Sequence, residues 1–203
     1  MIKCFYSELI YWLFSSFIIR RCEDKNYYLT FDDGPHPIVT PKILSILRQY
    51  NVKATFFVVG EMMSKHPQIV DQVLSEGHTL GWHSNSHKSN KKMKASELKY
   101  DLACFKQFEK KHSFQSNLYR PPYGDLTVTT ALQLIFKKWK IIMWSLDSRD
   151  SFDSQEKVMR NLSNNNLRGG EIILFHDDYE ETVKILNSFL LQLKDKGLKC
   201  NSF

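Results

Sequence analysis

Short apolar runs alternate with amphipathic stretches along most of the chain. The apolar runs are rich in β-branched and aromatic residues, which predicts buried strands. They cover Tyr27–Phe31, Ala54–Val59, Thr79–Trp82, Leu118–Tyr119, Lys140–Trp144, Glu171–Phe175 and Leu198–Ser202. Between them, apolar residues recur at helical spacing. The predicted helices cover Pro41–Tyr50 (with Thr40 as N-cap), His66–Gly77, Ala95–His112, Thr127–Phe136, Gln155–Asn165 and Tyr179–Lys196. Strands that alternate with helices predict a parallel α/β fold.

Polar residues cluster directly after five of these strands. The clusters are Asp32 to Pro35, His83 to His87, Arg120 to Gly124, Asp147 to Asp150, and His176 to Asp178. Barrels and open α/β sheets both place their sites at the carboxyl ends of the strands. We therefore expect these clusters to meet at one face of the sheet, a pattern that turn chemistry alone does not predict.

The first cluster holds two adjacent carboxylates, Asp32 and Asp33. Neighbouring side chains on a strand point to opposite sides, so the two acids are expected in unlike surroundings. Such a pair suits one general base and one metal ligand. For a bare Asp-Asp-Gly, a turn in which an aspartate closes the strand is the favoured interpretation, and only the clusters further along the chain change it.

His83 and His87 lie four residues apart with small polar residues between them, a spacing at which two imidazoles can bind one metal ion. Either histidine alone is more typical of a surface or core position. With Asp33 they form a two-histidine, one-carboxylate set, which suits zinc hydrolysis and also matches the facial triad of non-haem iron oxygenases. His66 and His78 fall at helix ends and are interpreted as bystanders.

Arg120 and His176 both stand where a strand stops. Arg120 is placed to orient a carboxylate through bidentate hydrogen bonds, or else to be a solvated charge. His176, oriented by Asp150 or Asp147, is a candidate general acid, or else a polar strand end. The backbone N–H near Tyr123 is a candidate donor to an oxyanion. Asp177 and Asp178 are expected to cap the last helix.

Composition indicates one ordered domain, since 42% of the 203 residues are hydrophobic and 13% are aromatic. The net charge of +6 suits an anionic partner but fixes no chemistry, and no nucleic-acid motif is present, so no nucleic-acid partner is expected. The lysine run from Lys88 to Lys94 is interpreted as a solvated loop or as an electrostatic rim for an anionic polymer. The four cysteines form no Cys-x-x-Cys pair and predict neither a zinc site nor a disulfide framework.

The N-terminal segment, residues 1–25, is the one stretch outside this pattern. Leu9–Ile19 is nearly all apolar, yet it is shorter than the roughly 20 residues that a membrane span needs. No small-residue cleavage site follows it, so it does not read as a signal peptide. We expect a helix packed on the domain, with peripheral membrane contact through residues 9–19 as the alternative.

These residues together make the chain resemble the polysaccharide deacetylase family (the NodB homology domain, carbohydrate esterase family 4). The resemblance runs from about Tyr27 to Phe203, and five family motifs appear in order. They are Thr30 to Pro35 (Thr-Phe-Asp-Asp-Gly-Pro), His83 to His87 (His-Ser-Asn-Ser-His), Arg120 to Gly124 (Arg-Pro-Pro-Tyr-Gly), Asp147 to Asp150 (Asp-Ser-Arg-Asp) and Leu174 to Asp177 (Leu-Phe-His-Asp). The resemblance implies a distorted, TIM-barrel-like (β/α)7 barrel over residues 26–203.

The resemblance also implies a role for each residue of the site. Asp32 is the general base, tethered by Arg120. Asp33, His83 and His87 hold a divalent metal, usually zinc, with cobalt or another divalent ion as substitutes.

The remaining implied roles concern the substrate and the leaving group. The Tyr123 N–H joins the oxyanion hole, and Leu174 lines a pocket for the acetyl methyl. His176, oriented by Asp150, is the general acid. One departure stands out: Ser151 follows Asp150 where the family usually has a tryptophan that walls the groove, and Phe152 is a candidate substitute.

The implied reaction is removal of N-acetyl groups from N-acetylglucosamine units of a peptidoglycan-like or chitin-like glycan. An O-acetyl xylan esterase on the same fold is the alternative, followed by a glycan-binding protein with impaired catalysis, for which Ser151 is the only hint. An iron oxygenase is the most distant reading, since a paired base and acid suit hydrolysis better. A glycan substrate suggests the cell envelope, whereas the absence of a clear export signal leaves the cytoplasm open. The oligomeric state stays undetermined.

Overall fold

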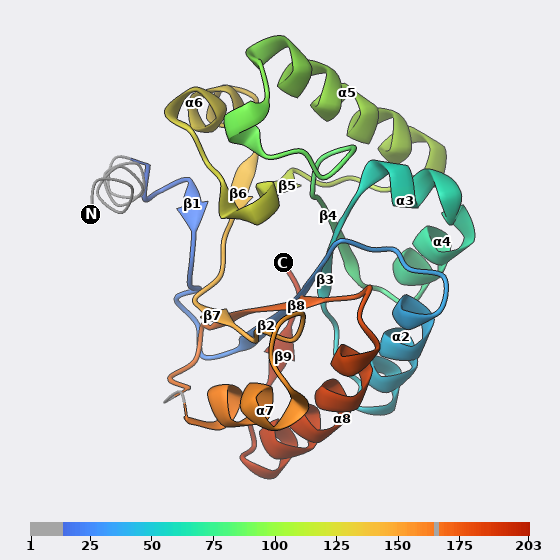
Figure 1. Cartoon of the computed structure of the whole chain (residues 1–203), viewed down its shortest axis with the longest axis vertical. Coiled ribbons are helices and arrows are strands. Elements are labelled where there is room, and N and C mark those ends of the chain that lie inside the picture. The colour runs from blue at the N-terminus through green and yellow to red at the C-terminus, as the bar shows by residue number, and fades with distance from the viewer. Residues whose placement is uncertain (1–13, 165–166) are drawn as a thin grey trace.

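A computed structural model describes residues 14–164 and 167–203 as one curled parallel sheet with helices around its outside (Figure 1). The strand order is β1-β6-β5-β4-β3-β2-β8-β7, and β9 pairs with β2. The strands are β1 (Ile18–Ile19), β2 (Tyr27–Asp32), β3 (Thr55–Val58), β4 (Thr79–Trp82), β5 (Leu118–Tyr119), β6 (Lys140–Ile142), β7 (Leu146–Asp147), β8 (Ile172–His176) and β9 (Cys200–Asn201).

The connections between the strands carry the helices. They are α2 (Val39–Gln49), α3 (Gly60–Lys65), α4 (Pro67–Ser75), α5 (Ala95–His112), α6 (Val128–Phe136), α7 (Gln155–Asn164) and α8 (Glu180–Asp195), with short 3-10 helices η1 (Asn90–Lys92) and η2 (Pro122–Gly124). Crossovers between parallel strands need such helices. None of the helices among the described residues is both long enough and apolar enough to cross a membrane.

The segment between β6 and β7 brings the two ends of the sheet together. The Met143 N–H donates to the Ile19 carbonyl (2.8 Å), and the Ser145 N–H donates to the Ile172 carbonyl (3.0 Å). An isolated antiparallel bridge between Arg21 and Glu171 adds a further link across this gap. The chain therefore closes irregularly, and the predicted distorted barrel is confirmed.

Strand β2 pairs with β3, β8 and β9, and every one of its residues is buried. The Phe31 ring stacks on Phe56 (centroids 5.0 Å apart) and on Phe175 (5.7 Å), which joins β2 to β3 and β8. The parallel register pairs Asp32 with His176 on β8. Core packing therefore fixes the relative position of these two polar residues at the carboxyl ends of their strands.

All seven predicted strands are present, and the described residues form two more, β1 and β7. Strand β1 lies in the apolar run that predicted a helix, and β7 lies where the polar cluster from Asp147 begins, so neither was predicted. The six-residue helix α3 was also not predicted, because Gly60 at its start reads as a loop residue.

Two predicted helix caps are wrong. Helix α2 begins at Val39 with Ile38 as its N-cap, and Thr40 instead donates its hydroxyl to the Asp177 carboxylate (2.6 Å). Helix α8 has Tyr179 as its N-cap with no side-chain cap, so neither Asp177 nor Asp178 caps it. Pairing between these two distant segments replaces the local caps.

The predicted N-terminal helix falls largely outside the described residues, which begin at Phe14. Within them, residues 14–17 form turns and Ile18–Ile19 forms β1, so a helix does not extend that far. The packing of residues 1–13 on the domain, and membrane contact through residues 9–19, stay predictions.

Candidate active site

The five polar clusters meet at one cleft of about 500 Å³ at the carboxyl ends of the strands. The cleft is lined by Asp32, Asp33, His83, His87, Tyr123, Gly124, Trp144, Asp147, Ser151, Phe152, Leu174, His176 and Tyr179. Arg120 and Asp150 lie directly behind this lining, bonded to Asp32 and His176. The structure thus brings every candidate site residue of the sequence to one place.

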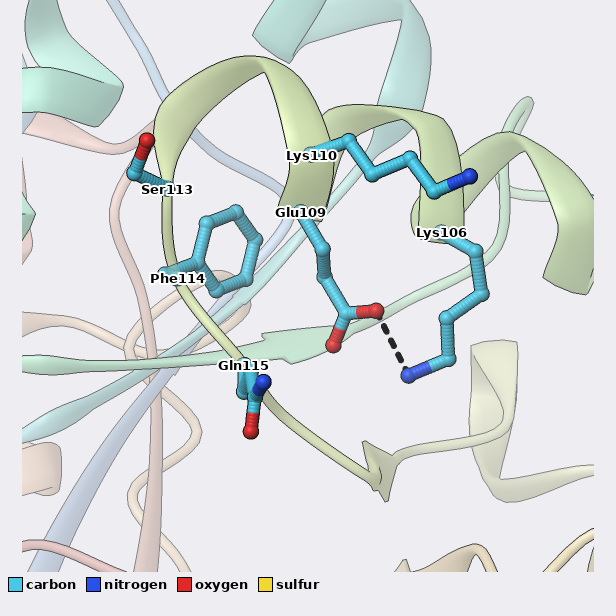
Figure 2. Close-up of a pocket in the computed structure, with 6 residues that line it drawn as sticks. All are labelled: Lys106, Glu109, Lys110, Ser113, Phe114 and Gln115. Carbon is cyan, nitrogen blue, oxygen red and sulfur yellow. Dashed lines mark ion pairs between the residues drawn. The ribbon is translucent and has the colours of Figure 1, made fainter.

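A second hollow, of about 600 Å³, lies at the end of α5 and contains none of these residues (Figure 2). Its carboxylate, Glu109, is ion-paired with Lys106 at 2.6 Å, as the dashed line marks. The same carboxylate also accepts the Ser116 N–H (2.6 Å). Both oxygens of Glu109 therefore have a partner at the end of α5. We do not interpret this hollow as an active site.

Arg120 is completely buried beneath Asp32 and uses its guanidinium to fix that carboxylate. Its Nη1 donates to Asp32 Oδ1 (2.7 Å) and to the Thr30 hydroxyl (2.8 Å). Its Nε and Nη2 donate to the carbonyls of Ile142 and Met143, both at 3.1 Å. Four of the five N–H groups of the guanidinium are therefore hydrogen-bonded, and one of them, rather than a bidentate pair, holds Asp32.

The pKa of Asp32 reflects two opposing effects. Burial raises it above its ordinary range, while the charge and hydrogen bond of Arg120, and the charge of His176, lower it. Burial is the larger effect, so the pKa of Asp32 is raised overall. Without Arg120 the carboxyl would be still harder to ionise.

Asp33, His83 and His87 form a cluster with the features of a metal site. Their ligand atoms all lie within 4.8 Å of one another. Asp33 Oδ1 is 3.1 Å from His87 Nε2 and 3.5 Å from His83 Nε2. This Asp33 oxygen is buried, yet it has no hydrogen-bond partner among the described residues. A buried oxygen left unbonded between two imidazoles fits a divalent cation, whose charge would satisfy all three groups.

His83 is held in the tautomer that a metal ligand needs. Its Nδ1 lies 2.9 Å from the Arg120 carbonyl, which can only accept, so Nδ1 carries the proton and Nε2 faces Asp33. Burial lowers the pKa of His83 to about 3, with the charges of His87 and Arg120 acting in the same direction and that of Asp33 against it. The imidazole is therefore neutral and has a lone pair to donate.

The backbone near the cluster is in an unusual conformation. Asp33 (φ 77°), Ser84 (φ 66°), His87 (φ 52°) and Tyr123 (φ 59°) all have positive φ, a region that residues other than glycine seldom occupy. Such positions persist only where the surroundings determine them, and they concentrate at functional sites. For Asp33, the positive φ gives a physical reason why two adjacent acids can serve the same cleft.

His176 and Asp150 form the second buried pair of the cleft. His176 Nδ1 lies 2.8 Å from Asp150 Oδ1, while Asp150 Oδ2 accepts the His176 N–H (2.8 Å) and the Thr182 hydroxyl (2.6 Å). Burial lowers the pKa of His176, but the hydrogen bond and charge of Asp150 raise it to about 9. Asp150 is thus the partner of His176, whereas Asp147 accepts the Arg149 N–H instead (2.9 Å).

The rim of the cleft is largely aromatic. The Tyr123 ring stands beside His87, with centroids 4.5 Å apart, and Leu174 lines the cleft from the buried strand β8. Ser151 also lines it, with a buried hydroxyl that has no partner among the described residues. Phe152 lies beside it with 79% of its side chain exposed, and Trp144 lies on the cleft wall.

Of two buried acids that support this site, sequence reasoning misassigned Asp177 and missed Asp101. Asp177 accepts the Gly34 N–H (2.9 Å) and the Thr40 hydroxyl, and burial raises its pKa to about 7. Asp101, on α5, accepts the indole N–H of Trp82 (2.5 Å) and the Asn85 N–H (2.6 Å). The only signal for Asp101 was its position on the apolar face of the helix, between Leu98 and Leu102 in the sequence.

The fold and the cleft define a barrel hydrolase with a candidate metal site. A family model described as polysaccharide deacetylase matches residues 20–139, more than half of the chain. The chain belongs to the polysaccharide deacetylase family, and it is a hydrolase of that class.

Similar proteins and solved structures agree with this family assignment. The chain is 35% identical over 184 residues to a peptidoglycan-N-acetylglucosamine deacetylase of Bacillus cereus, covering 87% of this chain and 85% of the relative. It is 33% identical to the peptidoglycan-N-acetylmuramic acid deacetylase PdaC of Bacillus subtilis, of which it spans only 36%. A crystal structure of a peptidoglycan N-acetylglucosamine deacetylase superposes with a TM-score of 0.87 at 30% identity, covering 95% of this chain and 93% of the other.

Proposed function

We propose that this protein is a metal-dependent N-deacetylase of N-acetylglucosamine units in a glycan, with peptidoglycan as the first substrate and a chitin-like polymer as the second. The observation that carries the proposal is that two carboxylate–cation pairs, Asp32–Arg120 and Asp150–His176, meet the Asp33–His83–His87 cluster at one cleft. The names of the relatives support peptidoglycan over other glycans. We also propose the cell envelope as its location, because peptidoglycan lies there.

Asp33, His83 and His87 would hold the divalent ion, for which zinc is the first choice because two imidazoles and a carboxylate with an open position suit it. When bound, such an ion polarises the acetamide carbonyl and lowers the pKa of water beside it. Asp32 Oδ2 lies 3.7 Å from His83 Nε2, next to the cluster. In our proposal, Asp32 accepts the proton of the attacking water, and Arg120 keeps Asp32 ionised for that purpose.

His176 is the proposed acid of the reaction. Because its pKa is raised to about 9, it carries a proton at neutral pH and can give it to the sugar nitrogen as the C–N bond breaks. The Tyr123 N–H would donate to the carbonyl oxygen as it gains charge, and Leu174 would line the space for the acetyl methyl. Proton transfer thus runs from water to Asp32 on one side and from His176 to nitrogen on the other.

The protonated His176 favours amide over ester hydrolysis. An alkoxide leaves more readily than an unprotonated amine, so an O-acetyl xylan esterase would gain less from so basic an imidazole. A glycan-binding protein without catalysis would need neither Asp32 nor His176 in a buried charged pair. Their presence argues against the hypothesis, suggested by Ser151, that catalysis is impaired.

Acetate release from peptidoglycan, chitooligosaccharides and acetylxylan tests the proposal. We expect release from an N-acetylated glycan, loss of that activity with a chelator, and recovery with added Zn²⁺. His83→Ala is expected to lose both metal binding and activity. Release from acetylxylan alone would favour the esterase, and metal binding without release from any substrate would favour the binding protein.

A further inference from the structure

The loop from Trp82 to His87, called the histidine loop below, carries both imidazoles of the candidate metal cluster. It leaves β4 without forming a helix, and two of its residues, Ser84 and His87, have positive φ. A short segment with two such residues does not hold this shape by itself. The positions of His83 and His87 therefore depend on the hydrogen bonds that other segments make to this loop.

Helix α3 holds the histidine loop through backbone hydrogen bonds. The Gly60 N–H donates to the Ser84 carbonyl (3.1 Å), and the Glu61 N–H donates to the Asn85 carbonyl (2.9 Å). The contact is close, since a Cβ on Gly60 would lie 2.3 Å from Asn85 Oδ1. These two hydrogen bonds are made by main-chain groups alone.

Asp101 of α5 also holds the histidine loop, through its side-chain carboxylate, and the residue is only 4% exposed. Its Oδ1 accepts the Trp82 indole N–H (2.5 Å) and its Oδ2 accepts the Asn85 N–H (2.6 Å). These two donors stand on either side of His83 in the chain. Among the described residues Asp101 has no ion-pair partner, so both of its oxygens are committed to this loop. The Trp82 ring in turn packs on Phe105 of α5, with centroids 4.8 Å apart.

We propose that Asp101 is a positioning residue that sets the metal affinity of the Asp33–His83–His87 cluster by holding the histidine loop in its ligating shape before the metal binds. The inference rests on the proposed function, because it assumes that the cluster takes a divalent ion. A carboxylate is required, since it alone presents two acceptors to two N–H donors. An asparagine carbonyl would accept one of these N–H groups, but its NH₂ group, itself a donor, would face the other N–H.

The test compares Asp101→Asn with Glu109→Gln in the intact chain. Glu109 is a matched control: it lies on the same helix, is 7% exposed and accepts a backbone N–H, but it contacts the α5–β5 loop rather than the histidine loop (Figure 2). The Zn²⁺ dissociation constant of the metal-free protein is measured by competition with a chromophoric chelator, the Co²⁺ site by its visible absorption, and stability by the melting midpoint.

We expect Asp101→Asn to weaken Zn²⁺ binding about tenfold or more, the range seen when groups that orient metal ligands are removed. The Co²⁺ absorption should change with it. Glu109→Gln is expected to lower the melting midpoint while leaving the dissociation constant within about twofold of the wild type. Saturating Zn²⁺ should restore most of the deacetylation rate of Asp101→Asn, since this residue does not touch the substrate.

Trp82→Phe provides a second route that leaves Asp101 in place. It removes one donor and should weaken Zn²⁺ binding less than Asp101→Asn does. In the double variant the asparagine carbonyl can accept the Asn85 N–H while its NH₂ group no longer faces an indole N–H. We therefore expect the double variant to bind Zn²⁺ more tightly than Asp101→Asn alone.

The inference fails if Asp101→Asn lowers the melting midpoint but keeps the wild-type dissociation constant, because Asp101 would then be merely structural. If that variant does not fold, an unchanged dissociation constant for Trp82→Phe has the same meaning. A wild type that binds Zn²⁺ through His83 but releases no acetate defeats the proposed function and leaves this inference standing. A wild type that binds neither Zn²⁺ nor Co²⁺ defeats both.

Discussion

The cleft contains two carboxylate–cation pairs that look alike and differ in one respect. Asp32 is bonded to Arg120, and Asp150 is bonded to His176. Asp32 and His176 are neighbours in the register of β2 and β8 and both line the cleft, while Arg120 and Asp150 stand behind them. In one pair the anion faces the cleft; in the other pair the cation does.

Which member of each pair faces the cleft decides which group can exchange a proton with a bound substrate. A guanidinium does not give up its proton near neutral pH, so Arg120 can only hold Asp32 in place and favour its charged form. An imidazole does exchange its proton, and Asp150 raises the pKa of His176 to about 9 by hydrogen bond and charge, against the effect of burial. The first pair thus suits the base of the proposed reaction, and the second pair suits its acid.

The largest effect is expected for Asp32→Asn, which removes the base and keeps its shape. We expect kcat to fall by about 10³ or more, because the amide cannot take the proton of the water. The Zn²⁺ dissociation constant should stay close to the wild-type value, since Asp33 and both histidines remain. Steady-state acetate release and chelator competition measure the two quantities.

Asp32→Asn also leaves the buried Arg120 without its anion, which is expected to cost stability. The breaking of a buried pair costs about 3–5 kcal/mol. Urea unfolding should therefore accompany the kinetics, so that activity is compared for folded protein only. If the folded variant retained most of its activity, Asp32 would not be the base.

The next effect concerns the other pair and depends on the substrate. His176→Ala should lower the rate of amide hydrolysis by about 10² to 10⁴, the usual worth of a positioned acid. An activated ester such as 4-nitrophenyl acetate should lose much less, since its leaving group departs without a proton. Comparison of the two substrates on one enzyme sample measures this. Equal losses on both would show that His176 does not protonate the leaving group.

Asp150→Asn tests whether the pair sets the pKa of the acid. His176 must carry its proton to act, so activity should fall as pH rises through about 9 in the wild type. Without the Asp150 charge, burial lowers the pKa of His176, so the alkaline limb of the pH profile should move to lower pH. The rate at neutral pH should fall about 10- to 100-fold.

Thr182→Val is the matched control for this shift. It removes the hydroxyl that donates to Asp150 Oδ2 but leaves the charge, so its alkaline limb should move far less. An alkaline limb that Asp150→Asn leaves unmoved would belong to another group.

The sequence was sufficient to predict seven of the nine strands in the described part of the chain and the convergence of the polar clusters. Buried strands carry their own signal in runs such as Tyr27–Phe31, and the parallel architecture then brings their carboxyl ends together. It did not predict β1 or β7, because Ile18–Ile19 belongs to an apolar run interpreted as a helix and Leu146–Asp147 lies where a polar cluster begins; only the structure shows their pairing with β6 and β8. The choice between Asp147 and Asp150 as the partner of His176 also needed the structure.

Residues that act through tertiary contacts were the ones that sequence reasoning misassigned or missed. Asp177 and Thr40 each looked like a local helix cap, yet they bond to each other across 137 positions of the chain. Asp101 looked like an ordinary helical residue, although its partners are Trp82 and Asn85. A local pattern cannot reveal a partner that only the fold brings near.

The smallest expected effect concerns the rim, where Ser151 replaces the tryptophan usual in the family. Phe152 lines the cleft with 79% of its side chain exposed, so it is placed to stack on a sugar ring. Phe152→Ala should raise KM about threefold to tenfold, the equivalent of one aromatic contact, and leave kcat nearly unchanged. Phe136→Ala, an 83% exposed phenylalanine on α6 outside the cleft, is the control and should change neither constant. If KM for chitooligosaccharides were the same in both variants, Phe152 would not replace the missing tryptophan, and the aromatic contacts with the sugar would come from Tyr123, Trp144 or Tyr179.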